Sequence, residues 1–224
     1  RAGLGATLVD KTVIIGAEAG EGVMVAGADG TIAIGYQAGT AITSGAANVV
    51  IGLQAGDALN TGGDNVAIGK NALGAATNTG GVVAIGHEAG ASVNSNNSNL
   101  SVFIGYNAGV GVTSGEHNVY IGYNAGKDDS TGDNNVAIGY AAFDETSNAS
   151  SENVYIGVGA GGGNDGATAS DSNVGIGRDA LAGALNGANE NVAVGRDALL
   201  SVTTADSNVA IGADALEYDV DGNN

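Results

Sequence analysis

One stretch of the sequence has the spacing of a nucleotide-binding loop. Residues 157–162 read Gly-Val-Gly-Ala-Gly-Gly, which matches the pattern G-x-G-x-x-G. That loop works only when a helix follows it, because the N-terminus of the helix binds the phosphates. No helix is predicted after Gly162, and Gly157 and Ala160 recur through the whole chain for another reason, given below. We therefore expect no nucleotide site here.

Acidic and histidine side chains are the next candidates for chemistry. Asp219, Asp221 and Asn223 have the alternate spacing of a calcium loop, but the glutamate that ends such a loop is missing. His87 and His117 lie at different positions of the repeat described below, so they do not form a metal pair. No nucleophile has a base at a recognisable spacing. We expect a protein without catalytic residues, cofactor or bound metal.

The chain is built from twelve copies of one short motif. Residues 65–73 read Asn-Val-Ala-Ile-Gly-Lys-Asn-Ala-Leu, and residues 118–126 and 208–216 repeat this pattern. We number positions within a copy from the central glycine, position 0. Successive glycines are 17 to 20 residues apart, at Gly16, Gly35, Gly52, Gly69, Gly86, Gly105, Gly122, Gly139, Gly157, Gly177, Gly195 and Gly212. A fixed period of this length indicates a repeat architecture.

Three positions of the repeat are nearly invariant. Position −1 is Ile in eleven copies and Val194 in the other, position −3 is Val except for Ile32, and position +3 is always Ala. Positions −3 and −1 point to one side of an extended chain, and β-branched residues favour strands. We predict an all-β fold, a parallel β-solenoid of about twelve coils with a repeat of ~17 residues, with pairs such as Val66 and Ile68 inside.

The residue between these two, at position −2, is never charged. It is Ala67, Tyr120 and Ala137 in three of the copies. If Val and Ile point inward, this residue points outward, and a strand that is apolar on both faces is usually covered on both. The sequence therefore predicts that another copy of the chain covers this column. We expect a homotrimer with Ala67, Tyr120 and Ala137 at the contact between chains.

Two further columns carry side chains that could bind or pair. Tyr106, Tyr123 and Tyr140 occupy position +1 of consecutive copies, where they could contact a glycan or stack on one another as a structural ladder. Three acids share position +2 near the C-terminal end, Asp179, Asp197 and Asp214. Stacked carboxylates repel, so we expect either that they splay into water or that the adjacent Arg178 and Arg196 offset them.

Composition excludes several classes of function. The formal net charge is −18, from 24 acidic and six basic residues, which disfavours binding to nucleic acid and to anionic membranes. No apolar run approaches the length of a membrane span. Cys and Pro are absent. We expect three segments: a lead-in or cap over 1–11, the solenoid over 12–216, and a linker over 217–224.

The repeat resembles the repetitive shafts of bacteriophage tail fibres. It is also similar to the heads of trimeric autotransporter adhesins, whose Val-Ala-Ile-Gly repeats form a parallel β-roll. The resemblance covers roughly residues 12–216. It implies a structural, trimeric segment of an extracellular attachment fibre, on a virion or a bacterial cell surface, that holds a receptor-binding tip away from its base. Alternatives are an adhesin head that binds host matrix or glycan, and a subunit of a self-assembling extracellular filament.

Overall fold

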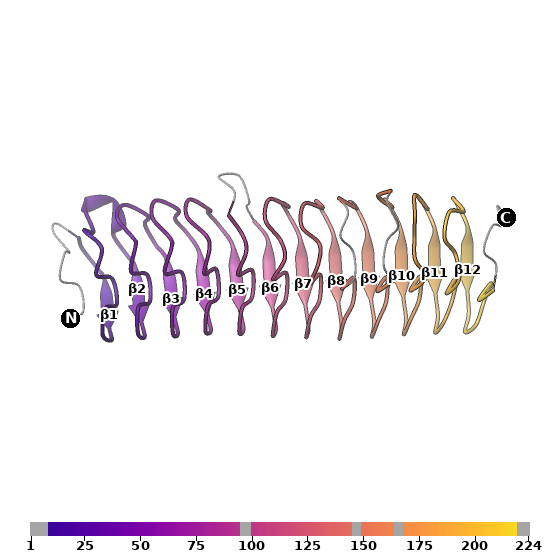
Figure 1. Cartoon of the computed structure of the whole chain (residues 1–224), viewed down its shortest axis with the longest axis horizontal. Coiled ribbons are helices and arrows are strands. Elements are labelled where there is room, and N and C mark those ends of the chain that lie inside the picture. Colours follow the sequence, from indigo (N-terminus) through magenta and orange to yellow (C-terminus); the bar gives the residue numbers. More distant parts are fainter. Residues whose placement is uncertain (1–8, 95–99, 145–148, 164–167, 219–224) are drawn as a thin grey trace.

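The chain forms one parallel β-solenoid, as the repeat predicts. A computed structural model describes residues 9–94, 100–144, 149–163 and 168–218. Twelve strands lie side by side in chain order, each paired in parallel with the next, and the coils stack into a rod (Figure 1). The strands are β1 (Val13–Ile15), β2 (Ile32–Ile34), β3 (Val49–Ile51), β4 (Val66–Ile68), β5 (Val83–Ile85), β6 (Val102–Ile104), β7 (Val119–Ile121), β8 (Val136–Ile138), β9 (Val154–Ile156), β10 (Val174–Ile176), β11 (Val192–Val194) and β12 (Val209–Ile211).

Outside the strands, the described part of the chain consists of turns and one short 3-10 helix, η1 (Ala26–Ala28). Among the described residues, no helix is long and apolar enough to cross a membrane. Most of the expected lead-in segment, and residues 219–224 of the expected linker, lie outside the described residues. The calcium-like spacing of Asp219, Asp221 and Asn223 falls there too.

Backbone hydrogen bonds join each coil to its neighbours. Around β4, the Val66 N–H donates to the Val82 carbonyl and the Gly69 N–H donates to the Ile51 carbonyl, both at 2.8 Å. The stack is tightest at position 0. A Cβ added to Gly69 would lie 2.3 Å from the Gly86 carbonyl oxygen, and Gly69 has φ +135°, which side chains rarely adopt. Glycine is invariant in this column because no other residue fits between successive coils.

The strands present the opposite face to the core from the one that the sequence predicted. Position −2, expected outside, is buried within the single chain: Ala67, Tyr120 and Ala137 each have 0% exposure. Val66 and Ile68, expected inside, are only partly buried and lie on the outer face. The prediction of Ala67, Tyr120 and Ala137 as a contact between chains was therefore wrong. The alternation of the strand was correct, but its assignment to inside and outside was reversed.

The physical reason lies in how each coil fills its interior. A side chain at position −2 shares the interior with position +4, and their sizes compensate. Where position −2 is Tyr120, position +4 is Gly126, and a Cβ there would lie 2.2 Å from the tyrosine ring. Where position −2 is Ala67, position +4 is the buried Leu73. Close packing explains this exchange, because each coil must fill about the same volume.

Asparagine at position −4 forms a second internal ladder beside the strand. The Asn65 amide nitrogen donates to Asn48 Oδ1 of the previous coil at 3.0 Å and to the Thr79 carbonyl at 2.8 Å. Asn65 Oδ1 accepts the Val82 N–H at 3.0 Å. These bonds satisfy backbone groups that the turn before each strand would otherwise bury without a partner.

Candidate functional site

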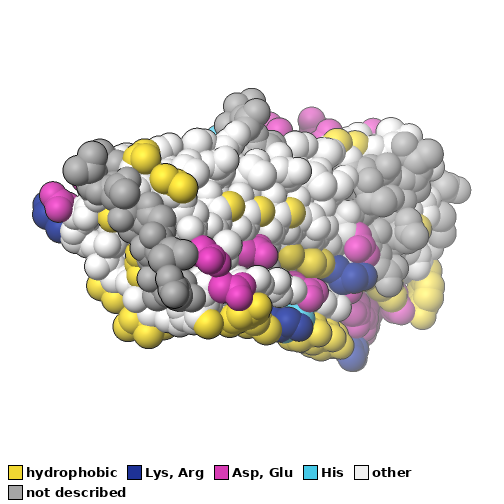
Figure 2. All heavy atoms as spheres, turned by 60° about the vertical axis from the view of Figure 1, so that its left-hand side comes forward, with side chains coloured by type: hydrophobic (Ala, Val, Ile, Leu, Met, Phe, Trp, Pro, Cys, Tyr) yellow, Lys and Arg dark blue, Asp and Glu magenta, His cyan; other side chains and the backbone are white. Residues whose placement is uncertain are grey.

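The most extensive feature of the surface is the outer side of the sheet, which we call the Val/Ile face. It consists of positions −3 and −1 of all twelve strands, and no residue in either column is charged. These side chains are half-buried in the middle of the rod because stacked neighbours cover one another, whereas Ile211 in the terminal strand β12 is 72% exposed. Figure 2 shows hydrophobic side chains along the lower edge of the rod, interrupted by basic and histidine side chains, with acidic side chains beside them.

The Val/Ile face is large enough for a stable contact between proteins. Twelve strands about 4.8 Å apart make it about 50 Å long. With the exposed columns on either side, at positions −5 and +1, the face is about 20 Å wide and covers on the order of 1,000 Å². A typical stable interface buries about 800 Å² on each partner. About half of this area is the uncharged Val/Ile face itself, on the order of 500 Å² of contiguous apolar surface. The columns at positions −5 and +1 add charged residues such as Asp64 and Lys70. Apolar patches of this size are often functional.

The tyrosines at position +1 form a stacked ladder beside this face. Ring centroids of Tyr106 and Tyr123 lie 5.3 Å apart and those of Tyr123 and Tyr140 lie 5.1 Å apart, with interplanar angles of 10° and 6°. His87 continues the stack, 4.7 Å from Tyr106. The ring faces therefore cover one another, which is the structural ladder weighed from the sequence. The exposed parts are ring edges and hydroxyl groups, the groups that such a ladder can offer to a glycan.

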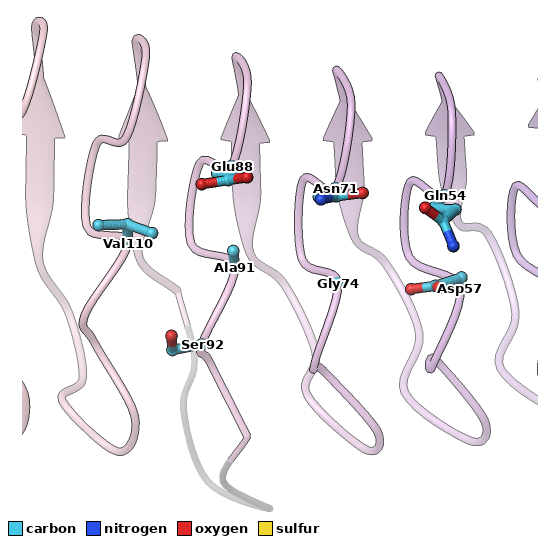
Figure 3. Close-up of a pocket in the computed structure, with 8 residues that line it drawn as sticks. All are labelled: Gln54, Asp57, Asn71, Gly74, Glu88, Ala91, Ser92 and Val110. Carbon is cyan, nitrogen blue, oxygen red and sulfur yellow. The ribbon is translucent and has the colours of Figure 1, made fainter.

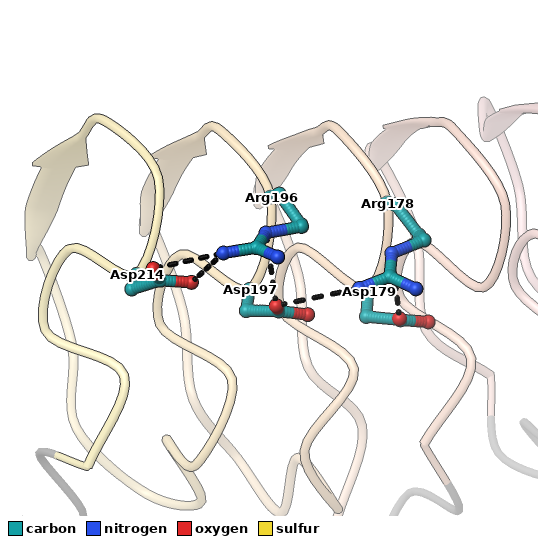
Figure 4. Close-up of polar contacts among 5 residues, drawn as sticks. All are labelled: Arg178, Asp179, Arg196, Asp197 and Asp214. Carbon is teal, nitrogen blue, oxygen red and sulfur yellow. Dashed lines mark hydrogen bonds and ion pairs between the residues drawn. The ribbon is translucent and has the colours of Figure 1, made fainter.

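Further along the same columns, the aromatic stack gives way to an ion-pair ladder. Arg178 Nη2 lies 3.6 Å from Asp197 Oδ2, and Arg196 pairs with both Asp197, at 3.3 Å, and Asp214, at 2.8 Å. Figure 4 shows the two guanidinium groups placed between the carboxylates of successive coils. The arginines thus offset the carboxylate repulsion, one of the two arrangements expected from the sequence. Because both guanidinium groups are about half exposed to water, the ladder contributes little to stability.

Two polar grooves run along the rod between the turns. One of about 460 Å³ is lined on its polar side by Gln54, Asp57, Asn71 and Glu88 (Figure 3). Partial burial raises the pKa of the Asp57 carboxyl above its ordinary value. A second groove of about 430 Å³ is lined by Asp171, Ser172, Asn189, Glu190, Asp206 and Ser207. Within the described residues, no group of three or more His, Cys, Asp or Glu side chains is placed to hold a metal ion.

Among the described residues, one buried carboxylate occupies a position that other coils fill with apolar residues. Asp129 occupies position +7, where Leu59 and Val112 are buried in other coils, and it too has 0% exposure. The Tyr120 hydroxyl donates to Asp129 Oδ2, and the Gly132 N–H donates to Asp129 Oδ1 at 2.9 Å. Burial, only partly offset by these bonds, raises the pKa of Asp129 to about 6 from an ordinary value of 3.8.

This pair gives the fold a specific pH dependence. Between pH ~4 and ~6 the folded chain keeps a proton on Asp129 that the unfolded chain releases, so the free energy of unfolding falls as pH rises through this range. A shift of this size corresponds to about 3 kcal/mol. Replacing both Tyr120→Phe and Asp129→Val reproduces the pair Phe103 and Val112 of the preceding coil. We expect the double variant to lose this fall and to be more stable than the wild type at pH 7.

Urea unfolding of both proteins between pH 4 and pH 8 measures the effect as a difference, in which contributions of the other carboxylates cancel. The single variant Asp129→Val is the control. It leaves the Tyr120 hydroxyl buried without its acceptor, at a cost of about 1–3 kcal/mol. Parallel stability curves for the wild type and the double variant across this range would contradict the assignment.

Sequence reasoning located the tyrosine and Arg–Asp columns but missed the Val/Ile face and the Tyr120–Asp129 pair. The signal for both was present in the sequence. The exchange of size between positions −2 and +4 indicates that these two columns face each other inside the coil. The copy that has Asp129 at position +7 also has Tyr120 at position −2, and the copy before it has Phe103 there.

Comparisons with protein-family models, curated proteins and solved structures found no match to this chain.

Proposed function

We propose that this chain is a structural segment of an extracellular attachment fibre, assembled as a homotrimer through its Val/Ile face. In this role the rod holds a receptor-binding tip away from its base. The observation that carries the proposal is the Val/Ile face itself, which runs without interruption along all twelve strands and contains no charge. Water exposure of so much apolar surface is unfavourable, and a fibre made of parallel chains removes it.

The rest of the surface supports the same reading. The net charge of −18 resides outside the Val/Ile face, so it keeps assembled rods soluble and apart and disfavours contact with nucleic acid or anionic lipid. The repeated coil fixes length and stiffness by simple addition of units, which suits a spacer. The likeness of the repeat to tail-fibre shafts supports a location on a virion, and its likeness to adhesin heads supports a bacterial cell surface as the alternative.

The proposal includes no catalytic role. A polysaccharide-cleaving spike needs two carboxylates facing each other across a groove, one of them with a raised pKa. In the larger groove, Asp57 has a raised pKa, and the other carboxylate that lines it, Glu88, comes from a turn on the same side of the rod, so the two do not face each other across the groove (Figure 3). The grooves of this rod are therefore better suited to contact than to hydrolysis.

The second candidate is an adhesin that binds glycan directly, and the tyrosine ladder is the observation that favours it. Tyr106, Tyr123 and Tyr140 are each about half exposed and present hydroxyl groups at a spacing of about one coil. A third candidate, a self-assembling filament, relies on the pairable edges of the sheet at both ends of a stack of coils.

A glycan array separates the first two functions. The wild type is compared with a variant in which Tyr106, Tyr123 and Tyr140 are all changed to Ser, with Tyr36→Ser as a control outside the stack. For a spacer we expect no specific binding by any of the three proteins. Binding that the triple variant loses and the control keeps would favour the adhesin. Growth of long filaments from the purified chain in negative-stain micrographs would favour the third candidate.

A further inference from the structure

The Val/Ile face is bordered by two columns of exposed side chains, which we call the leading edge and the trailing edge. The leading edge is position −5, two residues before the start of each strand, where the backbone has a positive φ in every coil. It contains Lys11, Gly30, Ala47, Asp64, Gly81, Leu100, His117, Asn134, Glu152, Ser172, Glu190 and Ser207. The trailing edge is position +1, and contains Ala17, Tyr36, Leu53, Lys70, His87, Tyr106, Tyr123, Tyr140, Val158, Arg178, Arg196 and Ala213.

Symmetry determines which edges meet when copies close around this face. Suppose that parallel copies are arranged around a symmetry axis that runs along the rods. The strands of all copies then run in the same direction around that axis, either all clockwise or all anticlockwise. The end of a strand in one copy then lies beside the start of the strand at the same level in the next copy. Such a contact is heterologous, since it joins different surfaces of the two chains, and it closes into a ring.

We propose that the trailing edge of each copy contacts the leading edge of the next, coil by coil, and that these contacts set the direction and register of the assembly. This inference rests on the assembly through the Val/Ile face proposed above and adds its orientation, its register and the residues that specify them. The partner is a second copy of this chain. The apolar face supplies the contact area, and the two edges supply the specificity.

The Lys and Arg residues of the trailing edge match acids at the same level. Three of the six basic residues lie on the trailing edge, and each has an acid before the strand of its own coil. Lys70 is level with Asp64, and Arg196 is level with Glu190. Arg178 is level with Asp171, which is next to the leading edge at position −6. Opposite charges across a contact favour the correct partner and register.

Within one chain these residues do not pair. Five residues of a turn and strand separate Asp64 from Lys70, a distance on the order of 15–20 Å along the face. Among the described residues, no ion pair joins the two edges of the rod; Arg178 and Arg196 pair only along their own side. Parallel copies would bring the matched charges together between chains.

Apolar side chains on the edges match in the same way. Leu100, on the leading edge, is 66% exposed, and Tyr106 lies level with it on the trailing edge. The third coil repeats this, since Leu53 is level with Ala47. Each such pair leaves water when the edges meet, which explains large apolar groups at otherwise solvent-facing corners.

An antiparallel arrangement lacks this match. It places the fourth coil opposite the ninth, so that Asp64 faces Glu152 and Lys70 faces Val158. It also places Arg196 opposite Tyr36. Like charges opposite each other are unfavourable, and no basic residue of the trailing edge meets an acid of the leading edge. The chemistry of the edges thus selects parallel copies in register.

Crosslinking through engineered thiols tests the proposal, because the chain contains no cysteine. Ala47→Cys and Leu53→Cys variants are coexpressed, one of them with a mass tag, and treated with a short bismaleimide, which tolerates a wider gap than a disulfide. We expect a covalent dimer of unlike chains from the mixture and none from either variant alone. A single chain carrying both changes is expected to give a covalent trimer.

The control mixture joins Leu53→Cys with Thr61→Cys, an exposed position in a turn away from both edges. It should give no dimer of unlike chains. Links between Leu53→Cys and Arg178→Cys, which antiparallel copies would place opposite each other, would overturn the proposal in favour of that arrangement. If the native mass is that of a trimer but residues 47 and 53 do not link, the edge contacts are wrong while the trimer stands. A native monomer without links overturns both.

Discussion

Replacing Gly122 by alanine is expected to cost about 3–5 kcal/mol of the free energy of unfolding. The glycine has φ +142°, a conformation that costs a side-chain-bearing residue about 1–3 kcal/mol. In addition, its new Cβ would lie 2.1 Å from the Gly139 carbonyl oxygen of the next coil. That oxygen belongs to the backbone, so the two coils must separate and weaken the hydrogen bonds between them. Urea unfolding followed by far-UV circular dichroism measures the loss.

Gly212 provides a matched control within the same column. It has φ +130°, but a Cβ at this position meets no atom within 4 Å. Gly212→Ala therefore carries the conformational strain without the clash between coils, and we expect it to cost about 1–3 kcal/mol. Equal losses for the two variants would show that the stack at position 0 is not closely packed and would contradict the structure of the coil.

Adjacent substitutions in strand β4 are expected to have opposite effects on folding and assembly. Ala67→Asp places an ionised side chain in a site with 0% exposure and no partner, which costs several kcal/mol and should unfold the surrounding coils. Ile68→Asp places the same charge on the Val/Ile face, where water reaches it. We expect this chain to remain folded but to lose assembly, since each copy would bring an unpaired carboxylate into the contact.

Circular dichroism and light scattering together distinguish the two variants. Ala67→Ser is the control for the core position, because it adds a small side chain without a full charge. The orientation of the strands would be contradicted if Ile68→Asp unfolded the chain while Ala67→Asp retained the β signal and melting behaviour of the wild type.

The overall architecture could be predicted from the sequence because the repeat encodes it directly. A fixed period, β-branched residues two apart and an invariant glycine are compatible with few folds other than stacked coils. Twelve glycines from Gly16 to Gly212 gave the number of coils, and each of them follows a strand in the structure. The spacing of the glycines is the same whichever side of each strand faces the core, so the period could not predict the inward-facing side.

The direction of the strand faces was missed because hydrophobicity is a poor guide when both sides are apolar. Val66 and Ile68 are more hydrophobic than Ala67. Choosing the more apolar pair as the core therefore reversed which side of the strand was predicted to face inward. Volume is the better guide here. The change from Ala67 with Leu73 to Tyr120 with Gly126 conserves the interior of a coil, whereas the Val/Ile columns hardly vary at all. Uniform columns produce a flat, regular surface, which favours contact with identical copies.

In the candidate site, contacts between equal positions of consecutive coils could be predicted from the sequence, whereas contacts across the interior of a coil could not. Same-column residues such as Tyr106 and Tyr123 were predicted to lie together, because stacking brings equal positions of consecutive coils to about 4.8 Å. The contact between Tyr120 and Asp129 was not predictable from the period, since it crosses the interior of a coil. The sequence shows an aspartate at position +7 and a tyrosine at position −2 of the same copy, but the period alone does not indicate that these two positions meet.

The native mass of the wild-type chain tests the role of the Val/Ile face most directly. Light scattering during size-exclusion chromatography, at micromolar concentration and neutral pH, gives this mass without reference to shape. We expect three times the chain mass of 21.4 kDa for the wild type and a single chain mass for Ile68→Asp. A folded wild-type protein that elutes at 21.4 kDa, with the Val/Ile face exposed to water, would contradict it.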